Sequence, residues 1–160
     1  MRRRLLAPLV ITAILYPSIA SADFTAFLGV NPTPTSRTVT GLSGGFGLLI
    51  VAFEFEYANT REDLDKLAPS LRTYMFNGLL QTPFPIAGMQ FYGTAGGGVF
   101  HETLNDRSET NVGYNVGGGV KMNLAGPLRL RFDYRVFTLQ GSDVRYSNPH
   151  RFYAGVNLKF

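Results

Sequence analysis

The chain has 160 residues, of which 45% are hydrophobic, 16% charged and 13% aromatic, and it contains no cysteine. This length suits one domain, the apolar content is too high for a disordered chain, and the missing thiols exclude a disulfide framework and a cysteine nucleophile. The formal charge of +4 suggests nucleic-acid binding, but three of the 15 basic residues are Arg2, Arg3 and Arg4. The charges of the other 12 are nearly balanced by those of 11 acidic residues. No nucleic-acid partner is therefore expected.

The first 22 residues are organised like a secretory signal peptide. The three arginines precede an apolar stretch from Leu5 to Leu15, and Ala20-Ser21-Ala22 follows. A charged start, an apolar centre of about ten residues and a small-residue ending are typical of such leaders, whereas a membrane anchor needs about 20 apolar residues. We expect cleavage between Ala22 and Asp23, which leaves residues 23–160 as one exported domain.

The exported domain alternates apolar and polar side chains with a period of two, which predicts β-strands. At its end, one face is formed by Phe152, Ala154, Val156, Leu158 and Phe160, and the other by Arg151, Tyr153, Gly155, Asn157 and Lys159. In chain order, the expected strands are Phe24–Val30, Val39–Leu48, Val51–Tyr57, Arg72–Leu80, Met89–Phe100, Val112–Leu124, Leu128–Val136 and Arg151–Phe160.

The connections between these strands alternate in length. The short ones are expected around Leu49-Ile50, which lacks turn residues, at Thr82–Ala87 and at Ala125-Gly126-Pro127. The long polar ones are expected at Asn31–Thr38, Ala58–Leu71, His101–Asn111 and Gln140–His150. Short turns on one side and long loops on the other predict an all-β fold, an eight-stranded antiparallel up-and-down barrel.

The outward face of this barrel decides between a membrane protein and a soluble one. Aromatic residues near the predicted strand ends are typical of the interfacial girdles of a transmembrane barrel, and predicted strand lengths fit a tilted crossing of the bilayer. These aromatics are Phe24, Tyr57, Tyr74, Tyr114, Tyr134 and Phe160. The sequence therefore predicts a transmembrane β-barrel, and a soluble secreted ligand-binding barrel is the alternative.

The segment His150–Phe160 resembles the closing strand of small bacterial outer-membrane β-barrel proteins. These are the families around the OmpA transmembrane domain, OmpX and the opacity proteins, and Gly117–Lys121 and Leu128–Arg135 are similar to their later strands. The resemblance implies a cell outer membrane location, contact with outer-membrane lipids, and recognition of the terminal strand by the barrel-assembly machinery. It implies no particular activity, because such barrels carry many functions.

Charged side chains on the polar face are expected to fill the interior of the barrel. An eight-stranded barrel has room for side chains and little else, and charges of opposite sign can satisfy one another there. The expected lumen network is Glu54, Glu56, Arg129, Arg131, Asp133 and Arg135, with Lys121, Arg151 and Lys159 as further candidates. A conducting pathway is the alternative to this plug.

Two glycine clusters, Gly96–Gly98 and Gly117–Gly119, match neither common phosphate-binding motif. We expect them to face each other across the fifth and sixth strands and to mark coiling or a close approach of the backbone. A docking groove for a lipid or a partner is the alternative.

Catalysis has weak support in the sequence. Asp143, Ser147 and His150 lie in the last loop, but the lipid A deacylase family carries His-x-Ser-Asn where this chain has Arg145-Tyr146-Ser147-Asn148, so the general base is missing. No metal-ligand spacing occurs around the two histidines, and neither a metal nor a cofactor is expected. We expect a monomer with a structural or surface-interaction role and no catalysis, with a lipid-modifying enzyme as the alternative.

Overall fold

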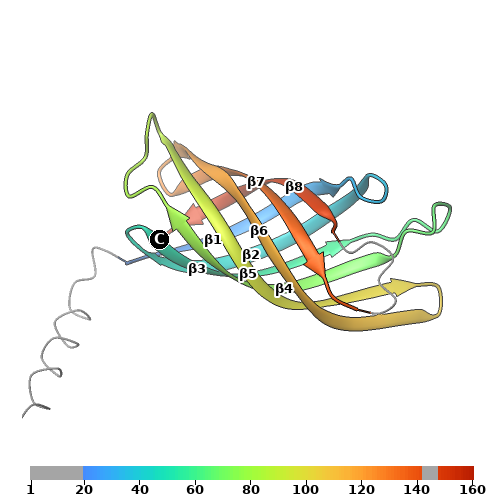
Figure 1. The fold of residues 1–160 in the computed structure, drawn as a ribbon. Coiled ribbons are helices and arrows are strands. Elements are labelled where there is room, and N and C mark those ends of the chain that lie inside the picture. Colours follow the sequence, from blue (N-terminus) through green and yellow to red (C-terminus); the bar gives the residue numbers. More distant parts are fainter. Residues whose placement is uncertain (1–19, 142–147) are drawn as a thin grey trace, which may run out of the picture.

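The computed structural model describes residues 20–141 and 148–160, which form one closed barrel of eight antiparallel strands in sequence order (Figure 1). The strands are β1 (Ala20–Asn31), β2 (Arg37–Leu48), β3 (Val51–Thr60), β4 (Ser70–Gln81), β5 (Met89–Leu104), β6 (Arg107–Ala125), β7 (Leu128–Leu139) and β8 (His150–Lys159). The up-and-down barrel expected from the sequence is confirmed. No helix in the described ranges is long and apolar enough to cross a membrane.

The seam that closes the barrel joins β1 to β8. Their register runs from Asp23 opposite Lys159 to Val30 opposite Phe152, and the backbones of Ala22 and Phe160 exchange hydrogen bonds of 3.2 and 2.8 Å. Strand β1 begins at Ala20, ahead of the expected cleavage point, but nearly all its pairing with β8 lies in the expected mature chain. Most of the predicted leader lies outside the described residues, so its cleavage stays a prediction.

The two ends of the barrel differ. The connections from β2 to β3, from β4 to β5 and from β6 to β7 lie at one end, here called the turn end, where Phe160 also lies (Figure 1). The connection at Leu49-Ile50 is a turn even though it lacks turn chemistry, and Leu49 takes the left-handed conformation with φ 52°. The opposite end, here called the loop end, carries the remaining connections.

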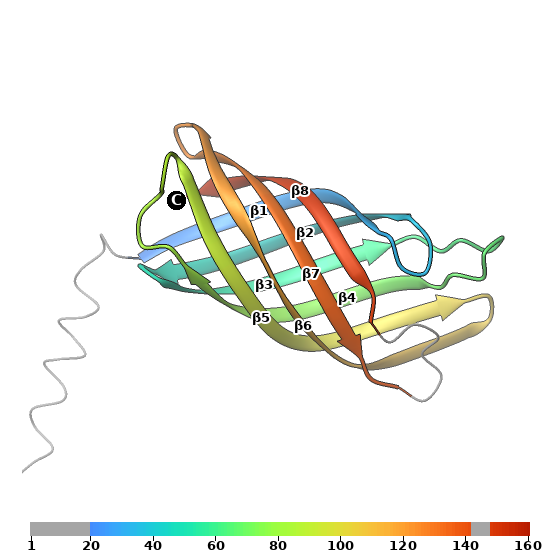
Figure 2. The ribbon, with the colours of Figure 1, turned by 45° about the horizontal axis from the view of Figure 1, so that its top comes forward.

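One loop expected from the sequence is a hairpin. Strands β5 and β6 continue through His101–Asn111 and leave only Asn105 and Asp106 as a turn, so the expected loop is wrong (Figure 2). Polar residues pair as well as apolar ones where a strand has left the bilayer, because there neither face has to be apolar. Asn105, with φ 52°, supplies the left-handed residue that the tight turn needs.

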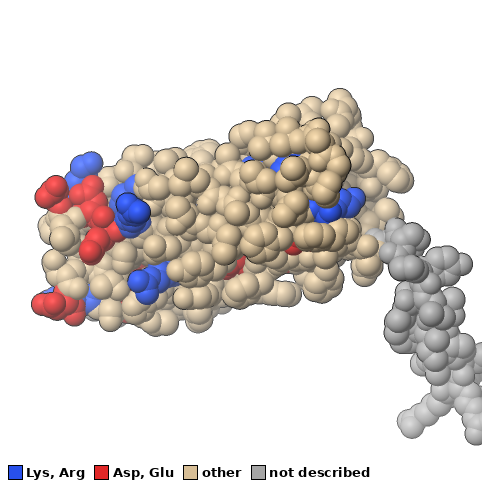
Figure 3. Space-filling model, turned by 180° about the vertical axis from the view of Figure 1, so that it is seen from behind, with Lys and Arg blue, Asp and Glu red and all other residues tan. Residues whose placement is uncertain are grey.

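The wall of the barrel is apolar outside and polar inside. In β3 the exposed Phe53 and Phe55 alternate with the buried Glu54 and Glu56. The expected girdle aromatics point outward from the wall, and Figure 3 shows a middle band almost free of charged residues between charged ends. A continuous apolar wall of this height is stable in lipid and not in water, so the soluble alternative is excluded.

The two glycine clusters do not face each other as expected. Gly97 lies opposite Tyr114, and Gly118 lies opposite Gly93, because the tight turn moves the centre of the hairpin two residues toward the N-terminus. Their structural interpretation is confirmed, since a Cβ on Gly98 would lie 1.9 Å from the carbonyl oxygen of Tyr74. The backbones of β4 and β5 thus approach closely at this point, where a side chain larger than that of glycine would clash.

Candidate functional site

The middle of the lumen holds a compact network of buried ion pairs. Strand β3 contributes Glu54 and Glu56, and β7 contributes Arg131, Asp133 and Arg135, each at the inward position of its strand. Arg151 of β8 completes the group, so three carboxylates meet three guanidinium groups. The network is therefore neutral as a whole.

Arg131 lies at the centre of this network and is fully buried. Its guanidinium pairs with Glu54 and lies 3.1 Å from Oδ2 of Asp133, while its Nε donates to the hydroxyl of Tyr92 at 2.7 Å. The Tyr92 hydroxyl in turn donates to Asp133. Each charged group thus has several partners, which is what the high cost of burying a charge requires.

Arg135 connects the two glutamates. Its Nη2 lies 2.9 Å from Oε1 of Glu54, its Nη1 lies 3.2 Å from Oε2 of Glu56, and its Nε donates to Asp133 at 2.9 Å. Arg151 pairs with Glu56 at 2.9 Å and donates to Thr73 at 3.1 Å. The network therefore joins β3, β4, β7 and β8 across the lumen.

A second charge cluster lies toward the turn end. Lys121 and Arg129 both pair with Asp23, the latter at 3.6 Å, and Arg129 also donates to Asn157 at 2.9 Å. A cavity of about 320 Å³ opens beside them at the turn end. Of the charges expected in the lumen, Lys159 is the exception, since it is exposed at the last position of β8.

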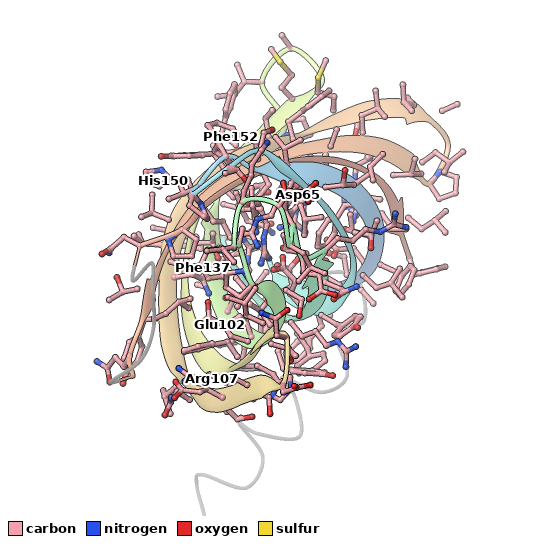
Figure 4. All side chains as sticks on the ribbon, turned by 90° about the vertical axis from the view of Figure 1, so that its right-hand side faces the viewer. Asp65, Glu102, Arg107, Phe137, His150 and Phe152 are labelled. Atoms are coloured by element: carbon pink, nitrogen blue, oxygen red, sulfur yellow. The ribbon has the colours of Figure 1, made fainter. Side chains whose placement is uncertain are left out.

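Toward the loop end the lumen holds an apolar cluster on β4, β5 and β7, beside the buried Asn31, Arg37 and Thr60 of β1, β2 and β3. The alternation of the sequence did not predict this cluster. Leu71, Met75, Phe100, Phe137 and Leu139 are buried in one cluster, here called the apolar cap. Seen from the loop end, side chains crowd the interior of the ring of strands, whereas the exposed Phe152 belongs to the outer wall (Figure 4). The ring of Phe137 also lies 4.4 Å from the guanidinium carbon of Arg151, so the cap packs directly on the charge network.

The lumen also holds aromatic residues, of which the sequence places Tyr153 on the polar face but does not single out Tyr92. Tyr92 and Tyr153 are buried, and the ring of Tyr153 stacks on Phe27 at 4.0 Å between centroids. Tyr153 lies on the same inward face as Arg151, as the alternation at the end of the chain predicts. Tyrosine suits this position because its ring fills volume while its hydroxyl reaches a carboxylate.

Beyond the cap, Glu102 lies on the hairpin at the loop end, past the last apolar outward residue of β5, Val99. Burial raises the pKa of Glu102 to about 7, with Arg37 acting against this shift and Glu109, opposite it on β6, adding to it. This carboxyl therefore titrates near neutral pH, outside the membrane.

The residues considered for catalysis are not brought together in the described chain. Asp143 and Ser147, together with Arg145 and Tyr146, lie outside the described residues. His150 lies on the outer face, where its Nδ1 is 2.7 Å from the hydroxyl of Tyr134. Within residues 20–141 and 148–160, no group of three or more metal-ligating side chains is placed to bind an ion.

An apolar outer wall around a lumen that holds buried charged side chains, closed by an unbroken ring of strands, defines an integral outer-membrane β-barrel. The protein resides in the cell outer membrane. The chain belongs to the family of outer membrane protein beta-barrel domains, whose model matches residues 16–160.

Solved structures share this fold at low sequence identity. The N-terminal β-barrel domain of Pseudomonas aeruginosa OprF has a TM-score of 0.66 and 16% identity, covering 88% of this chain and 97% of that chain. Neisserial surface protein A has the same TM-score, identity and share of this chain, with 96% of its own chain covered. The outer membrane enzyme PagL has a TM-score of 0.55 and 12% identity, covering 85% of this chain and 98% of its own. No curated protein matches the sequence.

Proposed function

We propose that this protein is a structural or surface-interaction barrel that presents its loop end to the exterior, with a plugged lumen and no catalysis. The observation that carries the proposal is the occlusion of the lumen by two stacked layers. The neutral charge network fills the middle, and the apolar cap packs on the loop side of it.

The two layers oppose ion flow in different ways. In the network, fully buried guanidinium groups such as those of Arg131 and Arg135 are held by several carboxylate oxygens each, so a passing ion would have to break buried pairs. In the cap, an ion would meet Phe100, Phe137 and Leu139, which replace none of its hydration with a polar ligand. Conduction therefore requires both layers to open.

Planar-bilayer recordings of the folded barrel test this proposal. We expect no discrete conductance steps from the native protein, and none from the Phe137→Ala variant, because the charge network still closes the lumen. Stable ohmic steps from folded native protein would overturn the proposed plug. Unheated and boiled samples run side by side in SDS gels establish that the recorded material is folded.

The absence of catalysis needs a separate assay. PagL shares only the fold at 12% identity, and His150 is held by Tyr134 on the outer face. We expect no change in lipid A acylation when the native protein is incubated with lipid A. Acyl release that disappears in a His150→Ala variant would replace the proposed role with a lipid-modifying one.

Assembly and oligomeric state complete the proposal. The outward residues of β8, namely Phe152, Ala154, Val156, Leu158 and Phe160, supply the terminal signal that the barrel-assembly machinery recognises. In the closed sheet, each of the eight strands has a hydrogen-bonded neighbour on both sides, which supports a monomer. Removal of the leader between Ala22 and Asp23 belongs to the same proposal.

A further inference from the structure

A row of polar residues crosses five adjacent strands on the outer wall at the loop end. The cross-strand partners place Thr40, Asn59, Arg72, His101 and Thr110 side by side from β2 to β6, and we call them the rim row. All five occupy outward positions, and none is a carboxylate. The row is therefore a continuous set of cationic, amide and hydroxyl groups on the outer wall.

The rim row lies directly above the apolar wall. Tyr57 and Tyr74, paired with ring centroids 5.1 Å apart, lie one outward position nearer the membrane than Asn59 and Arg72. One outward step along a strand is about 7 Å, so the row lies at the height where lipid headgroups meet acyl chains. Below Tyr74, the wall continues with the exposed Phe76.

Arg72 is the cation of this row without a partner. It is exposed on β4 and makes no hydrogen bond or ion pair with another described residue, unlike the buried arginines of the lumen. The carboxylates of the neighbouring hairpin, Glu102 and Glu109, occupy the opposite, inward parity of β5 and β6. The guanidinium is thus available to an anion from outside the protein.

His101 is already oriented within the row. Its Nδ1 lies 2.7 Å from Oγ1 of Thr110, and this contact leaves Nε2 for a ligand next to Arg72, its cross-strand partner. A planar guanidinium beside further donors is the arrangement that recognises phosphate oxygens.

We propose that the rim row binds the phosphate of a membrane lipid in the leaflet on the loop side. A lipid satisfies both parts of the surface, because its phosphate meets Arg72 and His101 while its acyl chains lie along Tyr74 and Phe76. A free phosphate would leave the apolar part unused. The inference rests on the position of the barrel in the membrane and is independent of the state of its lumen.

Lipid binding to the folded barrel in detergent, measured by native mass spectrometry, tests the proposal. The probes are phosphatidic acid and diacylglycerol with the same acyl chains, which differ only in the phosphate. We expect phosphatidic acid to bind the native protein in preference to diacylglycerol, and Arg72→Gln to weaken its binding about fivefold, the factor that corresponds to the contribution of one basic residue near an anionic lipid surface. Arg72→Lys should retain most of the affinity.

The matched control is Lys66→Gln, which removes one positive charge from the β3–β4 loop, where Lys66 already lies 3.7 Å from Asp63. We expect it to leave phosphatidic acid binding unchanged. An equal loss in Lys66→Gln and Arg72→Gln, no preference for phosphatidic acid over diacylglycerol, or displacement of the lipid by equimolar inorganic phosphate would each overturn the proposal. Gel mobility of unheated samples verifies that every variant is folded.

Discussion

Replacing Arg131 by leucine should lower the unfolding free energy of the barrel far more than a substitution at its surface. The variant loses the pairs to Glu54 and Asp133 and the hydrogen bond to Tyr92, and it leaves the neutral network with one surplus negative charge. Breaking a buried pair by removing one partner costs about 3 to 5 kcal/mol, because the other charge stays buried without full compensation. We expect a loss of unfolding free energy in that range.

The double variant Arg131→Leu/Glu54→Leu separates surplus charge from lost packing. It restores neutrality, and exchanging a buried pair for apolar residues of similar volume is often close to neutral. We therefore expect it to be more stable than Arg131→Leu alone. Lys66→Ala is the surface control, since its exposed pair with Asp63 should be worth less than about 1 kcal/mol.

The chain contains no tryptophan, so the measurement combines far-UV circular dichroism with gel mobility of unheated samples along a urea series. The reasoning would be refuted if Arg131→Leu cost no more than Lys66→Ala. The reasoning would also fail if the loss of unfolding free energy in the double variant equalled the summed losses of Arg131→Leu and Glu54→Leu, because the two charges would then act independently.

Three further changes test other parts of the molecule. Gly98→Ala should lower the urea midpoint strongly, because its Cβ would lie 1.9 Å from the Tyr74 carbonyl oxygen, whereas Gly78→Ala, with its nearest neighbour at 3.9 Å, should match the native protein. The pKa of Glu102 is raised to about 7, so its protonated form stabilises the folded hairpin. This stabilisation is complete at a pH below the ordinary pKa of glutamate, and it is lost as the pH rises through 7. Hydrogen exchange of the hairpin amides should therefore show about 1 kcal/mol more protection near pH 5 than near pH 8, after allowance for solvent screening, and Glu102→Gln should abolish the difference. Deleting Phe160 should sharply reduce outer-membrane levels, which cell fractionation measures, and unchanged levels would contradict the proposed assembly signal.

The charged half of the lumen could be predicted from the sequence because strands keep a strict alternation. Once Phe132 and Tyr134 are assigned to the outer wall, Arg131, Asp133 and Arg135 must point inward, whatever the details of the fold. The eight strands followed from the same alternation. The pairing of individual charges could not be predicted, because it depends on the shear between strands far apart in the chain.

The apolar cap and the outer hairpin could not be predicted for a related reason. Alternation fixes the side to which a residue points but not the polarity required there, so Phe137 and Leu139 are inward even though the middle of the lumen is charged. Beyond the bilayer, the lipid no longer demands an apolar face, and the polar residues from His101 to Asn111 read as a loop although they pair as strands. Sequence patterns are thus informative only where the solvent on one side of the strand is known.

The unequal ends of the lumen give the barrel a direction. Beside Asp23, Lys121 and Arg129 a cavity opens at the turn end, while the apolar cap packs on the loop side of the charge network. With the loop end toward the exterior, as proposed, this cavity opens toward the periplasm, so Asp23, Lys121 and Arg129 are the interior charges nearest to periplasmic solutes. The interior is thus unequal along its length, with an accessible charged pocket toward one compartment and packed apolar side chains toward the other.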